Sequence, residues 1–285
     1  MHIQDDNSRI EESIVQKPTK RPSKTTLGIL ITAIFGLLKF SKLTVLAKFL
    51  FTLLKASKFA GTFLSMALTI VLYAQIYSWL FAVGFVIVIF VHEMGHYVTS
   101  KKLGLDVSAP TFIPFLGAFI RMKSMPKSVK EEAITAIGGP AAGAFVTLVC
   151  LGIYSLTAAP YWAGLAYVSA LINLFNLLPF GFLDGGRISK AISPLIWVIG
   201  LILCVILIWK LHFYILVLIL IFGIFEIISM YRNKSETAQY LSVEPGFRLA
   251  IGTSYLLLLV LLVILMMYSL DISTALQSVQ ASLFR

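Results

Sequence analysis

Charged residues are scarce in this chain of 285 residues: they make up 13% of it, whereas 59% of its residues are hydrophobic. A soluble globular domain has about 25% charged residues, so this composition excludes that class. It also excludes an intrinsically disordered chain, because disorder requires low hydrophobicity and a high share of charge. We therefore expect a multi-pass protein of the cell membrane.

Cysteine is scarce too, and concentrated basic patches are lacking. Cys150 and Cys204 both lie inside apolar runs, where a thiol behaves as a small hydrophobic side chain. Two such residues predict neither a disulfide framework nor a cysteine-based metal site. The net charge of +10 could suggest a nucleic-acid partner, but no stretch interleaves Lys and Arg with stacking aromatics as that function needs. We expect the lipid bilayer as a partner, and no nucleic acid.

What the chain has instead is a series of apolar runs near the 17–25 residues that a spanning helix needs. They predict an all-α polytopic membrane protein with about six to seven transmembrane helices, at residues 60–78, 80–98, 134–156, 162–180, 193–209, 211–230 and 249–270. When the residue 98 end of the second run is placed in the cytoplasm, 21 of the 23 Lys and Arg fall on that side. This bias follows the positive-inside rule and places the N-terminus in the cytoplasm.

Three other stretches do not fit a spanning helix. Residues 1–25 are polar and predict a cytoplasmic tail. Residues 26–59 mix short apolar runs with lysines, which predicts an amphipathic segment on the inner leaflet, although a pair of short spans also fits. Residues 111–122 are broken by Pro114 and Gly117 and predict a short strand or re-entrant hairpin at membrane depth. Such backbone requires cover by protein or by a water-filled cavity.

The motif His-Glu-Met-Gly-His at 92–96 is the strongest chemical signal. In a chain of this composition, chance would produce on the order of 0.002 such matches. On a helix, His92 and His96 project from one face and can hold one zinc ion. Glu93 is turned away from both and suits a general base that acts on water. Because ionisable groups in an apolar span are costly and usually functional, the motif predicts a zinc hydrolase site toward the cytoplasmic side.

A catalytic zinc usually has three protein ligands and one open position, so a third ligand must come from elsewhere. Asp184 follows a helix that Pro179 ends, and the two glycines after it allow a tight turn toward the metal. Glu226 lies at a similar depth near the inner end of the sixth predicted span, and Asp106 is a more remote candidate. The residues favour Asp184 and leave Glu226 open.

Three motifs together resemble the site-2 protease family of intramembrane zinc metalloproteases. They are H-E-M-G-H at 92–96, G-G-P-A-A-G at 138–143 and N-L-F-N-L-L-P-F-G-F-L-D-G-G-R at 173–187. The resemblance covers about residues 60–190, which it implies are the catalytic membrane core. Residues 191–285, the C-terminal transmembrane helices, lie outside it. Residues 114–122 resemble the family's membrane-embedded β-region, which would pair with an unwound substrate helix.

The resemblance also implies roles for individual residues. His92, His96 and Asp184 would bind Zn²⁺, and Glu93 would be the catalytic base. Asn176 would act close to the metal, either by orienting the substrate or by stabilising the oxyanion. Asn173 is a weaker candidate, because an amide on a helix can simply bond a neighbouring helix.

The implied activity is hydrolysis of a peptide bond in or near a transmembrane segment of a membrane protein or peptide, as in regulated intramembrane proteolysis. One departure is Gly143, which stands where related sequences often have Asn. An alternative is a catalytically silent membrane scaffold or zinc-binding protein on the same fold, but the intact Glu93 argues against it. A transporter would be favoured by two repeated halves, and the sequence has no such repeat. The sequence names neither the substrate nor the oligomeric state.

Overall fold

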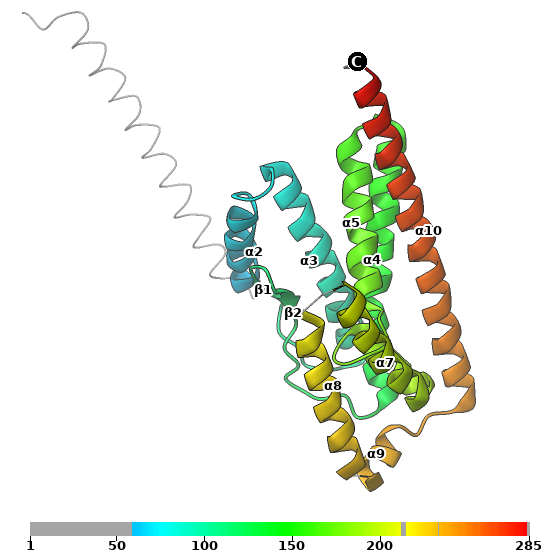
Figure 1. Cartoon of the computed structure of the whole chain (residues 1–285). Helices are drawn as coiled ribbons and strands as arrows, with labels where there is room; N and C mark the ends of the chain where they lie inside the picture. The colour runs from blue at the N-terminus through cyan, green and yellow to red at the C-terminus, as the bar shows by residue number, and fades with distance from the viewer. Residues whose placement is uncertain (1–58, 212–214, 233, 284–285) are drawn as a thin grey trace, which may run out of the picture. The chain divides into compact units, whose positions relative to one another are not determined.

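The structure is a computed structural model that describes residues 59–211, 215–232 and 234–283, all within the compact unit Lys58–Arg285 (Figure 1). The predicted polar tail and nearly all of the predicted lysine-rich segment lie outside these residues. The described chain is mostly helical and contains one short hairpin, as predicted. Its elements are α2 (Ala60–Tyr73), α3 (Trp79–Lys102), β1 (Thr111–Ile113), β2 (Gly117–Phe119), α4 (Val129–Thr157), α5 (Pro160–Asn176), α6 (Asp184–Ile192), α7 (Pro194–Leu211), α8 (Ile215–Arg232), α9 (Lys234–Tyr240) and α10 (Pro245–Leu283).

Three helices of the described residues are long and apolar enough to cross a membrane, judged by length and composition: α3, α4 and the Pro245–Ile272 part of α10. Helix α2 has 14 residues. At 1.5 Å per residue it is about 21 Å long, less than the roughly 30 Å of a bilayer's hydrocarbon core. Shorter apolar runs lie in α7 and α8, at Ile199–Lys210 and Leu220–Ser229. Three predicted spans are thus confirmed as helices of sufficient length, and the total of six to seven stays a prediction.

Side-chain caps explain where α3 and α4 begin. The Ser78 hydroxyl accepts a hydrogen bond from the Phe81 N–H (3.2 Å) at the start of α3. At the start of α4, the Ser128 hydroxyl accepts from the Glu131 N–H (3.4 Å), and the Glu131 carboxylate accepts from the Lys127 N–H (2.8 Å). These bonds satisfy N–H groups that have no partner inside the helix. The helix that carries the histidine motif and its neighbour α4 therefore have defined starting points.

The segment 111–122 contains the predicted hairpin. Strands β1 and β2 pair in antiparallel register. Strand β1 lies against α2 (Figure 1), and β2 contacts α3. The Thr62 hydroxyl on α2 donates to the Pro110 carbonyl (2.6 Å), and the Ser65 hydroxyl accepts from the Phe112 N–H (3.1 Å). Two hydroxyls of α2 thus bond one backbone group in β1 and one in the residue before it. These bonds satisfy part of the polar backbone that a hairpin packed among apolar helices would otherwise leave unpaired.

The main apolar core lies where α10 packs along α4, α5 and α6. Figure 1 shows α10 running beside α4 and α5. Helix α10 contributes four buried residues to it: Ile251, Tyr255, Leu258 and Leu262. The Tyr255 hydroxyl also donates to the Leu177 carbonyl (2.5 Å), just after the end of α5. Because the turn from Leu177 leads into α6, the C-terminal helix helps to hold the start of α6 in place.

Candidate metal centre

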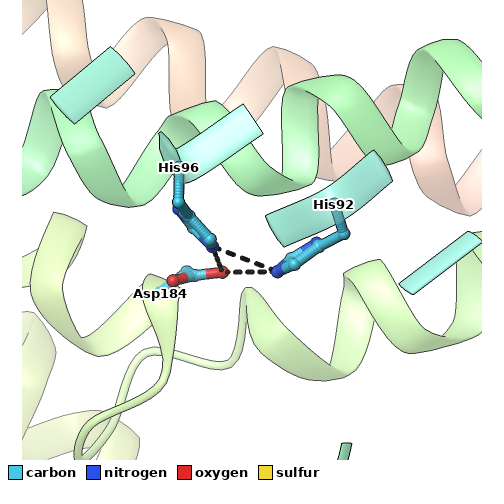
Figure 2. A group of neighbouring side chains, drawn as sticks. All are labelled: His92, His96 and Asp184. Carbon is cyan, nitrogen blue, oxygen red and sulfur yellow. Dashed lines mark hydrogen bonds and ion pairs between the residues drawn. The ribbon is translucent and has the colours of Figure 1, made fainter. Parts of the chain in front are cut away.

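Three side chains converge on one point between α3 and the start of α6, as Figure 2 shows. The Asp184 Oδ2 atom lies 3.3 Å from His92 Nε2 and 3.2 Å from His96 Nε2. The two histidine Nε2 atoms are 3.1 Å apart. His92, His96 and Asp184 therefore form a group that can hold a metal ion.

The spacing of these atoms fits a tetrahedral zinc site. Zinc binds imidazole nitrogen and carboxylate oxygen at about 2.0–2.2 Å, so ligand atoms at two tetrahedral corners lie about 3.3–3.5 Å apart. The three separations of 3.1, 3.2 and 3.3 Å are close to this value. Two imidazoles and one carboxylate are also a ligand set that catalytic zinc uses, with the fourth position left for water or substrate. The residues present thus fit the ion.

Each histidine is oriented by a hydrogen bond from its other ring nitrogen. The Nδ1 atom of His96 lies 2.9 Å from the Thr135 carbonyl, which can only accept, so this nitrogen carries the proton. The Nδ1 atom of His92 lies 2.8 Å from Asn173 Oδ1. Protonation at Nδ1 leaves Nε2 with the lone pair that a metal ligand requires. Both Nε2 lone pairs are therefore available on the side that faces Asp184.

Asp184 reaches the histidines because the chain reverses between α5 and α6. Helix α5 ends at Asn176, and Asp184 is the first residue of α6. A Cβ atom at Gly185 would overlap the Leu177 carbonyl, and one at Gly186 would overlap the Gly181 carbonyl. Both positions need glycine because α6 begins in contact with the preceding turn. The two glycines in the Asp-Gly-Gly sequence are thus explained by close packing.

Electrostatics favours the ionised form of Asp184. Burial by itself would raise the pKa of this carboxyl, but the adjacent His96 and His92, when they are protonated, hold it well below its usual range by charge and by hydrogen bonding. The first turn of a helix also favours a negative charge, and Asp184 occupies that turn of α6. In the neutral tautomers of the two histidines the carboxylate faces two nitrogen lone pairs, and a metal cation stabilises this arrangement because it can bind all three atoms.

Glycines on α4 make room for the histidine helix. A Cβ at Gly95 of α3 would overlap the Gly138 carbonyl of α4, and one at Gly138 would lie 2.7 Å from the Gly95 carbonyl. A Cβ at Gly139 would overlap the His96 imidazole, including its Nε2 atom. Gly95, Gly138 and Gly139 are therefore close-packing positions between the two helices, and Gly139 borders directly on a candidate metal ligand.

The other carboxylates considered in the sequence are placed differently. Asp106 lies 3.2 Å from Lys101 Nζ and 3.8 Å from Lys123 Nζ, and its side chain is 59% exposed. The hydrogen bond from Lys101 is the main reason why the pKa of this carboxyl is lowered. Asp106 therefore belongs to an exposed ion-pair cluster and does not join the histidines. The side chain of Glu226 lies outside what the structure describes, so Glu226 as the alternative third ligand stays a prediction.

Glu93 and Asn173 border the three candidate ligands. Glu93 lies next to His92 on α3 and is only 8% exposed. Asn176, the last residue of α5, is half-buried, and its catalytic role stays a prediction. Asn173 is fully buried and bonds His92 directly. From the sequence Asn173 is a weaker candidate than Asn176, because spacing along one helix does not reveal which residue of another helix a side chain meets. The contact with His92 could therefore not be predicted.

Comparisons with known proteins support the family resemblance. Residues 80–159 match the model of Peptidase family M50. Zinc metalloprotease MJ0392 of Methanocaldococcus jannaschii is 30% identical over 118 residues, which are 40% of this chain and 34% of that protein. Rip3 of Mycobacterium tuberculosis is 30% identical over 132 residues, which are 42% of this chain and 33% of that protein. This chain thus covers about a third of the length of these curated relatives.

Among solved structures, the Site-2 Protease from Methanocaldococcus jannaschii aligns with a TM-score of 0.40 and 23% identity, over 64% of this chain and 89% of that chain. The matches to the family model and to the curated relatives confirm the resemblance that the three motifs indicated. The family-model match includes the H-E-M-G-H and G-G-P-A-A-G motifs and ends before Asp184. The case for Asp184 as the third ligand therefore rests on the geometry of this chain.

Proposed function

We propose that this chain, which resembles the M50 peptidases of the site-2 protease type, is an intramembrane zinc metalloprotease. It would hydrolyse a peptide bond in or near a transmembrane segment of a membrane protein or peptide, as in regulated intramembrane proteolysis. The observation that carries this proposal is the group of His92, His96 and Asp184, spaced for a tetrahedral zinc ion and built partly on a helix long and apolar enough to cross a membrane.

In this proposal His92, His96 and Asp184 hold one Zn²⁺. When bound, the ion would polarise the scissile carbonyl and activate water for attack. Glu93 accepts the proton of the attacking water as the new carbon–oxygen bond forms. It then donates that proton to the leaving nitrogen as the carbon–nitrogen bond breaks. Glu93 suits this task because it neighbours His92 on α3 without joining the three-ligand group.

The substrate of this reaction would be a helix that has locally unwound. Carbonyl groups inside a helix are hydrogen-bonded to the N–H four residues on, so a scissile bond must first lose those bonds. We propose that β1 and β2 receive the extended stretch by strand addition, which supplies backbone hydrogen bonds with little side-chain selectivity. Asn176, the last residue of α5, would orient this extended substrate or stabilise the oxyanion.

The site would lie toward the cytoplasmic face of the membrane. His92 and His96 are in the second half of α3, which ends with Lys101 and Lys102. Lysines at a helix end mark the cytoplasmic side under the positive-inside rule. Water would therefore reach the site from the cytoplasm, and the lipid bilayer would surround the helices.

The test is cleavage of defined substrates by purified protein. A panel of synthetic single-span peptides in detergent or liposomes would be incubated with the wild type and with Glu93→Gln, and the products identified by mass spectrometry. We expect internal cleavage by the wild type, its loss in Glu93→Gln, and its loss with chelator followed by recovery with added zinc. Zinc-loaded wild type that cleaves none of a broad panel would point instead to the silent scaffold.

A further inference from the structure

Asn173 has no assigned task in the proposed reaction, yet its side chain is fully buried near the C-terminal end of α5. Its two polar atoms are both engaged. The Nδ2 atom donates to the Ser169 carbonyl (2.7 Å), and the Oδ1 atom lies 2.8 Å from His92 Nδ1. A buried amide is costly unless it is bonded in this way, so its position calls for an explanation.

The bond to Ser169 determines which atom of the amide faces His92. A backbone carbonyl can only accept, so the atom that lies against Ser169 must be the NH₂ group. The amide oxygen then faces His92, and the Nδ1 atom must donate the proton. The remaining nitrogen, Nε2, keeps its lone pair and lies 3.3 Å from the Asp184 carboxylate. Asn173 therefore selects the His92 tautomer that can bind a metal.

Gly143 on α4 provides the space for this amide. A Cβ atom at position 143 would overlap all three atoms of the Asn173 amide group, Cγ, Oδ1 and Nδ2. Any other residue at 143 would therefore force the amide away from His92. Position 143 is a glycine here, where related sequences often have Asn. The Asn173 amide on α5 occupies the space that a side chain at 143 would need.

Hydroxyl groups hold α4 and α5 at this close distance. The Thr147 hydroxyl donates to the Ser169 hydroxyl (2.9 Å), and both lie within hydrogen-bonding distance of the Gly143 carbonyl, at 3.0 Å for Thr147 and 3.3 Å for Ser169. Thr147 and Ser169 are both fully buried. Because these bonds cross the helix interface one turn from Asn173, they fix the depth at which the amide reaches toward α3.

We propose that Asn173 is the positioning residue of His92, and that Gly143 is the space that admits it. The inference rests on the proposed function only in that the site must hold a metal. It predicts that zinc affinity depends on the acceptor oxygen at 173 and on the absence of a side chain at 143. Loss of a hydrogen-bond partner of a metal-binding histidine typically lowers metal affinity by about 10–100-fold.

The first experiment measures zinc affinity of the purified full chain in detergent, by competition with a chromophoric chelator. Asn173→Leu keeps the approximate shape of the side chain but removes the acceptor, and we expect it to bind zinc about 10–100-fold more weakly. Asn173→Asp keeps an acceptor for His92 but places a second oxygen against the Ser169 carbonyl, so it should bind zinc more tightly than Asn173→Leu. The control is Ser155→Ala, which removes a hydroxyl hydrogen bond to the Gly152 carbonyl (2.7 Å) within α4, more than three helical turns beyond Gly143, and should leave the affinity unchanged.

The second experiment tests the pairing of the two positions by a double-mutant cycle. Gly143→Ala should lower zinc affinity by a similar factor in the wild type, because its methyl group displaces the amide. In an Asn173→Ala background the same change should have little further effect, since no amide remains to be displaced. Thermal unfolding without metal, recorded for each variant, separates loss of the fold from loss of the ligand orientation.

The outcomes distinguish this inference from the proposed function. If the wild type binds zinc and Asn173→Leu binds it with equal affinity, the positioning role is refuted and the metalloprotease proposal stands. Additive losses in Gly143→Ala and Asn173→Ala would show that the two positions act separately, which also refutes it. A wild type that takes up no zinc would overturn both.

Discussion

Gly139→Ala tests the geometry of the metal centre without changing any residue that would touch the metal. The added Cβ would overlap the His96 imidazole, which includes the Nε2 atom 3.2 Å from Asp184. Carbon and ring atoms need roughly 3.5 Å between them, so the ring must move by about 1 Å or more unless the helices separate. A zinc–nitrogen bond tolerates deviations of only about 0.2 Å. One of the three ligands is therefore lost.

The magnitude follows from the loss of a direct ligand. Displacing a partner of a ligand costs about 10–100-fold in metal affinity, so displacing His96 itself should cost more than about 100-fold. The assay is zinc competition with a chromophoric chelator, with apparent unfolding temperatures recorded on metal-free protein. Gly152→Ala is the matched control, since the same change on the same helix meets no described atom within 4 Å. Wild-type affinity in Gly139→Ala would refute the assignment of His96 to this geometry.

Three further predictions concern other parts of the site. Glu93→Gln should keep zinc but slow peptide cleavage by about 10²–10⁴-fold, the usual contribution of a general base, in the peptide assay; loss of zinc instead would make Glu93 a ligand. Asn176→Ala should also keep zinc and lower the cleavage rate by about 10²–10³-fold if the side chain stabilises the oxyanion; an unchanged rate would remove it from the reaction. Tyr255→Phe removes the donor to the Leu177 carbonyl and should lower the free energy of unfolding by roughly 1–2 kcal/mol; no change in a denaturant titration would show that α10 does not hold this turn.

The helix placements could be predicted because hydropathy acts locally. Each of the seven apolar runs overlaps a helix of the described residues. Helix α2 ends at Tyr73, before the end of its predicted run at residue 78, and Ser78 caps the next helix. The histidine pair could also be predicted, because the four-residue spacing on a helix fixes the shared face. A short strand or a re-entrant hairpin was predicted at 111–122, and the antiparallel pairing of β1 with β2 shows a two-stranded hairpin.

Contacts between helices were harder to predict. The turn at Gly185 and Gly186 made Asp184 a candidate, but only the packed structure places its carboxylate 3.2–3.3 Å from both histidines. Asn173 was ranked low because nothing in its own helix identifies the residue it faces. The sequence feature that pointed most directly to this contact was Gly143, a position without a side chain. It could be interpreted only once α5 was seen to pack against it.

Zinc content measured by mass spectrometry on the purified chain tests the central claim most directly, because it requires no substrate. The wild type would be compared with His92→Ala, Asp184→Asn and Glu226→Gln. We predict one zinc per chain in the wild type and in Glu226→Gln, with zinc lost from the other two. Zinc retained in Asp184→Asn and lost in Glu226→Gln would contradict the ligand set, and a wild type without zinc would contradict the metal centre itself.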